Sequence, residues 1–334
     1  MQKKLRAGII GLGVGQEHIK GYLSHPQCEV KAICDFDEEC LNYVANRFSI
    51  PEKTTNPDEI LNHSEIDVVS ICSYDSYHAT QVIQALENRK HVMVEKPVCL
   101  NKKEAEKIIM LLRKTGTKLT SNLILRKSPR FINLKDKINK DLFGKIFYVE
   151  GDYIYGKSYK ITHGWRGKID FYCGVFSGGV HVIDLLWWLV DSDVEEVFSY
   201  GNRICTENTA FKFEDCIVSI LKFKNGCIGK TLTTLCCVQP HFHALKIYGT
   251  KSTFINNYQD ADWYKTAEHK DRISINDDYP GVEKAALIPD FIDSILNNKK
   301  PYVSEQDVFK TMSVCFATYE SLISGHPTKV EYLL

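Results

Sequence analysis

The chain has 334 residues, of which 44% are hydrophobic and 25% are charged, a composition typical of a globular protein with room for two domains. Lysine plus arginine and aspartate plus glutamate both total 42, so no net charge favours nucleic acid or an anionic membrane as a partner. No apolar run approaches the roughly 20 residues that a membrane-spanning helix needs, and residues 1–6 lead into a strand-like run instead of a signal sequence. We therefore expect a cytoplasmic protein.

The twelve cysteines form no pattern typical of a metal site. Cys34, Cys72 and Cys227 lie in apolar, strand-like runs, where cysteine packs as a small hydrophobic residue. No Cys-x-x-Cys pair occurs, and the adjacent Cys236 and Cys237 are interpreted as reduced residues of one strand. We therefore expect no bound metal ion.

The first part of the chain alternates strands and helices. Strand-like runs cover 6–10, 29–34, 67–72, 91–94 and 118–123, and helical patterns lie between them, among them 38–48, 57–61, 77–88 and 102–113. By the right-handed crossover rule, this repeating order builds a doubly wound parallel sheet. We predict an α/β dinucleotide-binding domain over residues 1–122.

A glycine-rich turn follows the first strand. It consists of Gly11, Leu12, Gly13, Val14 and Gly15. Glycines there let the backbone approach a pyrophosphate, at which the helix N-terminal N–H groups point. The third glycine comes one residue earlier than in the usual G-x-G-x-x-G pattern.

An acidic residue ends the second strand. Asp35 lies 24 residues after Gly11, where a carboxylate can accept hydrogen bonds from ribose hydroxyls and would repel a 2′-phosphate. Asp35 could instead cap the helix at 38–48, but Asp37 fits that role better. The combination of turn and acid predicts a dinucleotide site that prefers NAD to NADP.

A charged pair follows the strand at 91–94. Glu95 and Lys96 stand at the carboxyl end of that strand, where open α/β sheets bind ligands. Pro97 disfavours a helical conformation at Lys96 and so keeps the lysine in an extended segment. The alternative interpretation is that both charges are solvated loop residues.

Two loops carry a resemblance to a known family. The runs 71–79 and 91–97 resemble the hallmarks of the Gfo/Idh/MocA oxidoreductases, which include glucose–fructose oxidoreductase and inositol dehydrogenase. The resemblance implies a lysine that contacts the reacting hydroxyl, and a set of cofactor contacts from Ser73, Tyr74, His78, Glu95 and Lys96. Tyr74 departs from the usual family loop. His78 can equally be a satisfied side chain at a helix start.

Past residue 122 the pattern changes to consecutive strands. Strand-like runs cover 145–153, 194–200, 215–223, 227–235, 244–248 and 252–256, and helical patterns cover 129–140, 285–296 and 305–324. Short turns between strands indicate antiparallel pairing. We predict an α+β domain over 123–334 with one broad, mostly antiparallel sheet. An apolar outer face on that sheet would favour a homodimer or homotetramer.

Residues 178–189 are typical of a glycine-rich entry to a buried helix that carries a histidine. The family resemblance places His181 near the nicotinamide, opposite Lys96, whereas a satisfied core histidine is the alternative. Asp184 lies one turn later and could orient the imidazole. Asn122 and Arg126 resemble the crossing into the second domain, and they are expected to contact cofactor and substrate, respectively.

The segment 153–166 is aromatic and basic. Trp165 and Arg166 resemble a pair that reaches the cofactor in some family members, although Arg166 could equally bind substrate. Tyr153 begins the run that we interpret as the specificity-setting loop, with a solvated loop as the alternative. The predicted substrate contacts are therefore Lys96, Arg126, Tyr153, Arg166, His181 and Asp184.

We thus predict an NAD-dependent oxidoreductase that transfers a hydride between nicotinamide and a secondary hydroxyl or ketone of a sugar or sugar derivative, a nucleotide-sugar being one option. His181 is the expected base and Lys96 the expected hydrogen-bond donor to the reacting oxygen, although the two roles could be exchanged. The rival hypotheses are an NAD-using glycoside hydrolase that works by oxidation and elimination, and a non-catalytic dinucleotide-sensing regulator.

Overall fold

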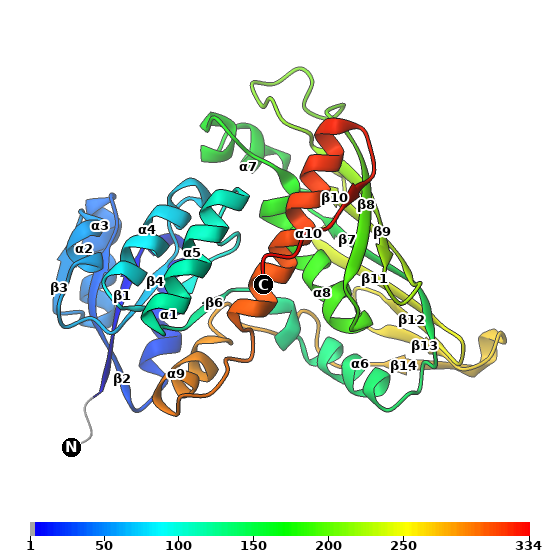
Figure 1. Ribbon diagram of the computed structural model, residues 1–334, viewed down its shortest axis with the longest axis horizontal. Helices are drawn as coiled ribbons and strands as arrows, with labels where there is room; N and C mark the ends of the chain where they lie inside the picture. Colours follow the sequence, from blue (N-terminus) through cyan, green and yellow to red (C-terminus); the bar gives the residue numbers. More distant parts are fainter. Residues whose placement is uncertain (1–3) are drawn as a thin grey trace. The chain divides into compact units, whose positions relative to one another are not determined.

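The computed structural model describes residues 4–334, and the chain divides into two compact units (Figure 1). The first unit comprises residues up to 124 together with 283–310 and 333–334, and the second comprises 125–282 and 311–332. The first crossing thus lies close to the predicted boundary, but residues 283–310 group with the first unit. Residues 1–3, part of the stretch expected to lead into the first strand, lie outside the described residues.

The first unit is built on a six-stranded parallel sheet. Its order, β3-β2-β1-β4-β5-β6, confirms the predicted doubly wound sheet. The strands are β1 (Leu5–Ile10), β2 (Cys28–Cys34), β3 (Glu52–Thr54), β4 (Val68–Ile71), β5 (His91–Val94) and β6 (Leu119–Ser121). The four residues of β4 are all buried, as expected of a central strand covered on both faces.

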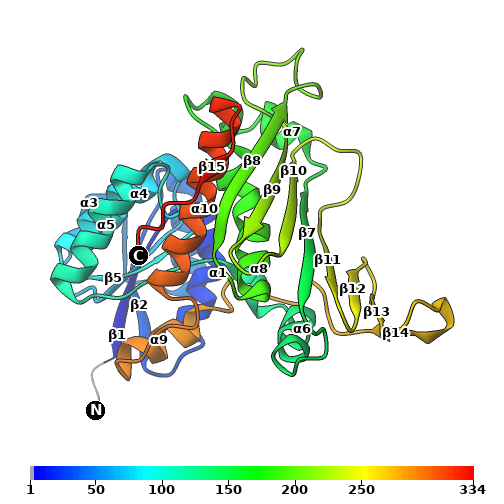
Figure 2. The same ribbon diagram turned by 45° about the vertical axis from the view of Figure 1, so that its right-hand side comes forward.

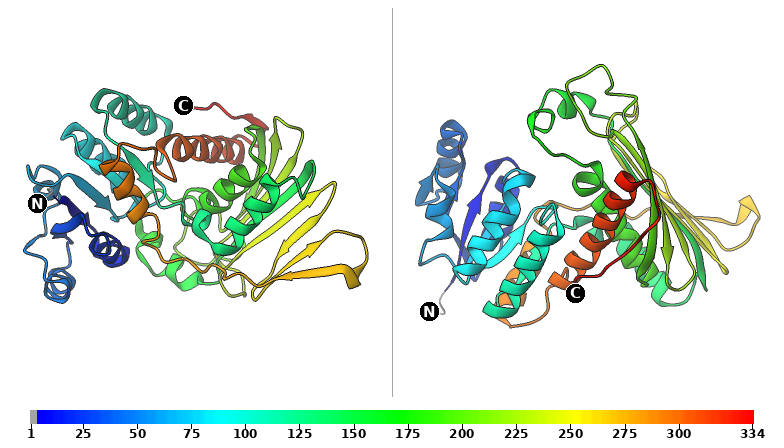
Figure 3. Two further views of the ribbon diagram at one scale, coloured as in Figure 1. Left: turned by 90° about the horizontal axis from the view of Figure 1, so that it is seen from below. Right: turned by 45° about the horizontal axis from the view of Figure 1, so that its top comes forward.

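Helices connect these strands and cover the sheet (Figure 3). They are α1 (Leu12–Leu23), α2 (Glu38–Phe48), α3 (Pro57–Leu61), α4 (Asp75–Glu87), α5 (Lys102–Thr115) and α9 (Ile288–Leu296). One group comprises α1, α2 and α9, and the other comprises α3, α4 and α5. The Asp37 side chain accepts hydrogen bonds from the backbone N–H groups of Glu39 and Cys40, so it caps α2 as predicted.

Helix α9 explains why residues 283–310 group with the first unit. It packs against α1, and a Cβ atom at Gly21 would lie 2.9 Å from the Cβ of Ala285 and 3.1 Å from that of Ile288. The helices therefore approach each other at a glycine. The fully buried Ile288, Phe291 and Ile292 add an apolar face to the core of the first unit.

The second unit is built on a nine-stranded sheet of order β14-β13-β12-β11-β7-β10-β9-β8-β15. Only the β7–β10 pair is parallel, which confirms the predicted mostly antiparallel sheet. The strands are β7 (Ile146–Ile154), β8 (Val194–Asn202), β9 (Cys216–Phe223), β10 (Ile228–Thr234), β11 (Phe242–Gly249), β12 (Thr253–Asn256), β13 (Ala261–Tyr264), β14 (Arg272–Ile275) and β15 (Thr328–Lys329).

Within the second unit, α6, α8 and the part of α10 from Thr311 onward lie on one face of this sheet (Figures 1 and 2). The helical segments are η1 (Ile124–Lys127), α6 (Pro129–Asn139), α7 (Ser158–Thr162), η2 (Trp165–Lys168), η3 (Val175–Gly179), α8 (Val180–Val190), η4 (His269–Asp271) and α10 (Glu305–Ser324). The segment η3 is a π-helical turn that runs into α8. Eight of the eleven α8 residues are buried, as predicted for this helix.

Candidate active site

The three glycines of the first turn have distinct surroundings. Gly11 has φ +86°, and a Cβ there would lie 2.4 Å from the Cys72 carbonyl oxygen, so this turn requires glycine. A Cβ at Gly15 would lie 2.9 Å from the Ile9 side chain, so this glycine lets α1 pack closely on β1. A Cβ at Gly13, in contrast, would meet no atom within 4 Å. The middle glycine therefore leaves open the backbone surface that a phosphate would approach.

The Asp35 carboxylate lies against this turn. One carboxylate oxygen accepts a hydrogen bond from the Leu12 backbone N–H at 2.6 Å, and the other accepts from the Asp37 N–H at 3.0 Å. The carboxylate is thereby fixed beside the N-terminus of α1, at the end of β2. This is the position from which an acidic side chain can bind the ribose of a dinucleotide.

A buried network holds the glutamate of the Glu-Lys-Pro segment. His18 on α1 is fully buried and its Nε2 lies 3.2 Å from Glu95 Oε1, while its Nδ1 lies 2.7 Å from the Ser70 hydroxyl. The Asn122 amide donates to the same Glu95 oxygen at 2.7 Å. Three elements of the first unit, α1, β4 and the segment after β6, therefore fix Glu95 and the lysine that follows it.

Charge pairing stabilises this network. Burial by itself would lower the pKa of His18, but Cys72 and Glu95 outweigh burial and raise it to about 10. Burial would likewise raise the pKa of Glu95, yet His18, Lys96 and Asn122 lower it to about 2. His18 is therefore an imidazolium that donates to Ser70 and to the Glu95 carboxylate. Sequence analysis missed His18, since only the fold brings it next to Glu95.

His78 connects the two loops that carry the family resemblance. Its Nδ1 lies 2.7 Å from the Pro97 carbonyl oxygen and its Nε2 lies 3.1 Å from the Ser73 carbonyl oxygen. Both ring nitrogens thus have protein partners, and the predicted contact of His78 with the cofactor stays a prediction. The Ser73 hydroxyl donates to the Gln81 side chain at 2.7 Å, and Tyr74 precedes the first residue of α4.

The residues of the first unit fit a dinucleotide. The open backbone at Gly13, the α1 N-terminus and Asp35 suit a pyrophosphate and a ribose. The Asn122 Oδ1 atom is buried and accepts no hydrogen bond from the described part of the chain, so it has capacity for a donor such as a carboxamide. Bound NAD would supply hydride chemistry, for which these side chains supply binding and alignment.

His181 lies at the start of α8, next to an aromatic cluster of the second unit. The Tyr153 ring from β7 is nearly parallel to the His181 ring, with centroids 6.4 Å apart. A Cβ at Gly178 would lie 2.3 Å from the Tyr153 ring, so the glycine-rich entry to α8 makes room for this tyrosine. The structure therefore brings together Tyr153 and His181, two of the predicted site residues.

The same cluster contains two histidines that sequence analysis missed. The His243 ring lies 6.0 Å from the His181 ring and 5.5 Å from the Tyr153 ring, and the His241 ring lies 4.8 Å from His243. The signal in the sequence was the spacing of two histidines separated by one residue at the start of a strand. Residues two apart in a strand share a face.

Arg126 and Asp184 form a buried ion pair in the second unit. The guanidinium donates two hydrogen bonds to the carboxylate, at 2.9 and 2.6 Å, and the Thr311 hydroxyl donates to the same carboxylate at 2.9 Å. The side chains are only 3% and 1% exposed. This bidentate pair, with the Thr311 hydrogen bond, connects η1 to α8 and α10. The predicted substrate contacts of Arg126 and Asp184 stay predictions.

Trp165 and Arg166 lie in η2, where the guanidinium stacks over the indole at 4.4 Å from the ring centroid. Their predicted contact with the cofactor stays a prediction.

Among residues 4–334, no group of three or more histidine, cysteine, aspartate or glutamate side chains is arranged to hold a metal ion. In the same range, no helix is both long and apolar enough to cross a membrane.

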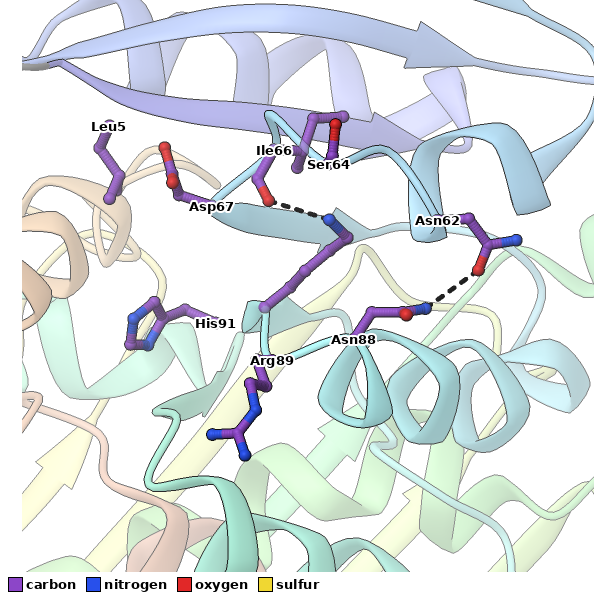
Figure 4. A pocket seen from close by; sticks show the side chains of 9 residues that line it. Leu5, Asn62, Ser64, Ile66, Asp67, Asn88, Arg89 and His91 are labelled. Atoms are coloured by element: carbon purple, nitrogen blue, oxygen red, sulfur yellow. Dashed lines mark hydrogen bonds between the residues drawn. The ribbon is translucent and has the colours of Figure 1, made fainter.

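A surface pocket of about 480 Å³ lies at the edge of the first sheet opposite to the glycine turn and Glu95 (Figure 4). It is lined by the amino ends of strands, including Leu5 and His91, whereas α/β sheets bind ligands at the carboxyl ends. The Lys90 ammonium donates to the Ile66 carbonyl oxygen at 2.9 Å inside it. The lysine therefore has a structural partner, and we do not assign this pocket to the candidate site.

The fold and the glycine turn define an NAD-binding oxidoreductase. Residues 5–123 match the family model described as "Oxidoreductase family, NAD-binding Rossmann fold", and residues 135–331 match "Oxidoreductase family, C-terminal alpha/beta domain". The chain belongs to the Gfo/Idh/MocA oxidoreductase family, as the sequence resemblance predicted.

Relatives of known name match all or part of its length. Myo-inositol 2-dehydrogenase of Thermotoga maritima is 24% identical, with 99% of this chain and 100% of the relative covered. A solved levoglucosan dehydrogenase in complex with NADH and levoglucosan superimposes with a TM-score of 0.88 at 20% identity, covering 98% of this chain and 100% of that chain. A glycosyl hydrolase family 109 protein of Shewanella pealeana is 26% identical, over 48% of this chain and 39% of the relative.

Proposed function

We propose that the protein is an NAD-dependent dehydrogenase that oxidises a secondary hydroxyl of a sugar or cyclic polyol, or reduces the matching ketone. The observation that carries this proposal is the buried His18–Glu95–Asn122 network, which fixes Lys96 at the sheet edge that also carries the glycine turn. The names of the full-length relatives, an inositol dehydrogenase and a levoglucosan dehydrogenase, support the same substrate class.

Lys96 and His181 are the proposed catalytic residues. The Lys96 ammonium donates a hydrogen bond to the reacting hydroxyl and stabilises negative charge that develops on its oxygen. The His181 imidazole takes the hydroxyl proton, a role for which imidazole is the usual side chain. The exchanged assignment, with Lys96 as base, predicts the same essential residues and differs only in the group that carries the proton.

Substitution of each catalytic residue tests this mechanism. Lys96→Ala and His181→Ala should each lower turnover by roughly two to four orders of magnitude and leave the dissociation constant of NAD nearly unchanged. The matched controls are Lys103→Ala and His269→Gln, since both side chains are exposed, and both should retain wild-type turnover. Unchanged turnover in Lys96→Ala and His181→Ala would exclude the mechanism.

The substrate within this class is identified by binding. A thermal-shift screen of the NAD-loaded protein against polyols, free sugars, sugar acids and nucleotide-sugars separates these classes, because a ligand that binds the folded protein raises its melting temperature. Free sugars and polyols should stabilise it. A response to UDP- or dTDP-sugars alone would favour the nucleotide-sugar alternative.

A glycoside hydrolase is the second candidate function, because one relative carries that name over about half of this chain. In that reaction the sugar would lose a hydride to bound NAD, the ketone would acidify a neighbouring C–H bond, and elimination would release the leaving group. Water would then add to the carbon–carbon double bond and the hydride would return to the ketone, so NADH would not accumulate. Chromogenic aryl glycosides distinguish the two candidates. Release of the aryl alcohol without net NADH would favour the hydrolase.

The protein is also proposed to assemble through the second sheet. On the face opposite the helices, Val218, Ile220 and Ile228 are exposed and lie on neighbouring strands. Beside them Lys230 pairs with Glu150 and Asp152 at about 3 Å. An apolar, exposed face with a central ion cluster suits a self-complementary interface between two copies of the chain.

A further inference from the structure

The aromatic cluster around His181 contains a pair of imidazoles, His241 and His243, that carries an inference about the substrate. The pair lies on the face of the second sheet that carries α8. His243 is the direct strand partner of Tyr153 in the β7–β11 register, and the His241 ring meets the Tyr153 ring edge-on at 5.1 Å. Tyr155 stacks on Tyr153 with ring centroids 5.9 Å apart, so the pair stands beside stacked aromatic rings.

Hydrogen bonds fix the proton of His243. Its backbone N–H donates to the Tyr279 hydroxyl oxygen at 2.7 Å, and its Nδ1 lies 2.7 Å from the same oxygen. The His243 carbonyl oxygen lies farther from that hydroxyl, at 3.5 Å. The tyrosine proton therefore goes to Nδ1, the nearer acceptor. In the neutral ring the remaining hydrogen is then on Nε2, which is a donor.

His241 has the opposite tautomer. Its Nδ1 lies 2.8 Å from the Ile154 carbonyl oxygen, which can only accept a hydrogen bond. Nδ1 therefore carries the hydrogen, and Nε2 of the neutral ring presents a lone pair. Burial lowers the pKa of His243 to about 3, and partial desolvation lowers the pKa of His241 as well, so both rings are neutral at pH 7.

The outward nitrogen of each ring is available. Across residues 4–334, Nε2 of His241 and Nε2 of His243 have no hydrogen-bond partner. The His243 side chain is nearly buried, yet its Nε2 is not among the buried polar atoms that are sealed from solvent. A donor and an acceptor are therefore carried by neighbouring rings whose centroids lie 4.8 Å apart, and the His243 ring centroid lies 6.0 Å from that of the proposed base His181.

We propose that His241 and His243 select a substrate ring that carries two adjacent hydroxyl groups, one accepting from His243 Nε2–H and the other donating to His241 Nε2. A hydroxyl can play either role, whereas a carboxylate or phosphate only accepts and would face the lone pair of His241. The specificity is therefore for a neutral vicinal diol next to the carbon that is oxidised. This inference rests on the proposed function, because it places the diol near His181.

The test uses binding and turnover separately. The probes are myo-inositol, scyllo-inositol and levoglucosan, each paired with a monodeoxy analogue, and glucuronate as an anionic control. Binding to the NADH-loaded protein is measured by calorimetry, and NAD reduction by absorbance. Wild type should bind at least one diol about 3- to 30-fold more tightly than its best monodeoxy analogue, the range expected for one or two neutral hydrogen bonds.

The variants are chosen to separate recognition from packing. His243→Leu and His241→Leu should abolish the diol-to-deoxy ratio and raise KM with little change in kcat, while NAD affinity stays within about twofold. His243→Gln and His241→Gln, whose amides offer a donor and an acceptor, should restore part of that ratio. His269→Gln, at an exposed position, is the matched control and should behave as wild type.

Each outcome separates the two proposals. Diol binding that depends on the pair, without NAD reduction by any probe, would support the imidazole pair and exclude the proposed function. NAD reduction with the same diol-to-deoxy ratio in wild type and in His243→Leu would overturn the imidazole pair and leave the proposed function standing. Two further results would also overturn the imidazole-pair proposal: glucuronate that binds more tightly than every neutral probe, or no binding of any probe.

Discussion

The His18–Glu95 pair makes a prediction about stability that can be worked out from the structure. His18→Leu would remove the imidazolium that is hydrogen-bonded to the Glu95 carboxylate, whose side chain is 15% exposed, and leave it only Lys96 and Asn122. Loss of one partner of a buried pair costs about 3–5 kcal/mol, and the hydrogen bond from Asn122 places the effect near the lower end. In a unit of about 150 residues, about 3 kcal/mol corresponds to a melting temperature lower by about 6–12 °C.

The pH dependence follows from the direction of the pKa shift. The folded-state pKa of His18 is raised to about 10, so its stabilisation is complete below the unfolded pKa of about 6.5 and is lost as pH rises toward 10. The difference in unfolding free energy between wild type and His18→Leu should therefore be largest near pH 6 and shrink between pH 7 and 10. Chemical denaturation at several pH values measures it.

Two further variants make the experiment decisive. In His18→Leu/Glu95→Gln no buried charge lacks a partner, so more than half of the lost stability should return. His269→Leu is the matched control, because the His269 side chain is exposed, and its loss should cost less than about 0.5 kcal/mol. A His18→Leu effect that is the same at pH 6 and pH 10, or a double variant no more stable than the single one, would refute the reasoning.

Three other substitutions test separate features. Gly13→Val should weaken NAD binding at least about tenfold with little loss of stability, because a side chain there meets no protein atom but occupies the path of the pyrophosphate; fluorescence titration with NADH measures this. Arg126→Met should destabilise the second unit by about 3–5 kcal/mol in chemical denaturation, because it leaves Asp184 buried and without its cation. Ile220→Glu should convert the proposed assembly to monomers in light scattering, because a charge replaces apolar surface on the exposed sheet face; an unchanged mass would exclude that interface.

The sequence predicted the elements whose signal is local. Buried apolar runs such as Val68–Ile71 and the glycine turn at Gly11 determine their own conformation, so the parallel sheet and its binding edge were predictable. The strand β3, with the sequence Glu-Lys-Thr, was missed because three polar residues carry no hydrophobic periodicity. The helix α7 was missed because, unlike the equally short α3, it begins with neither a capping side chain nor a proline.

The parts of the candidate site that were missed depend on contacts between distant residues. Glu95 lies 77 residues from His18, so nothing near either residue indicates their charge pair. His243 meets Tyr153 only through the register of two strands far apart in the sequence. Asp184 was expected to orient His181 because it is one turn away, but helical spacing could not indicate that Arg126 and Thr311 both bind its carboxylate.

The packing of α9 on α1 has a consequence for protein synthesis. The ribosome makes the six strands of the first sheet within the first 124 residues, but the helix that fills the space above Gly21 follows only after residue 287. During most of translation the apolar surface of α1 around Gly21 is therefore not yet packed against α9. A nascent chain arrested before Ile288 should consequently be captured by chaperones and cut readily by proteases, and release of the finished polypeptide should end both.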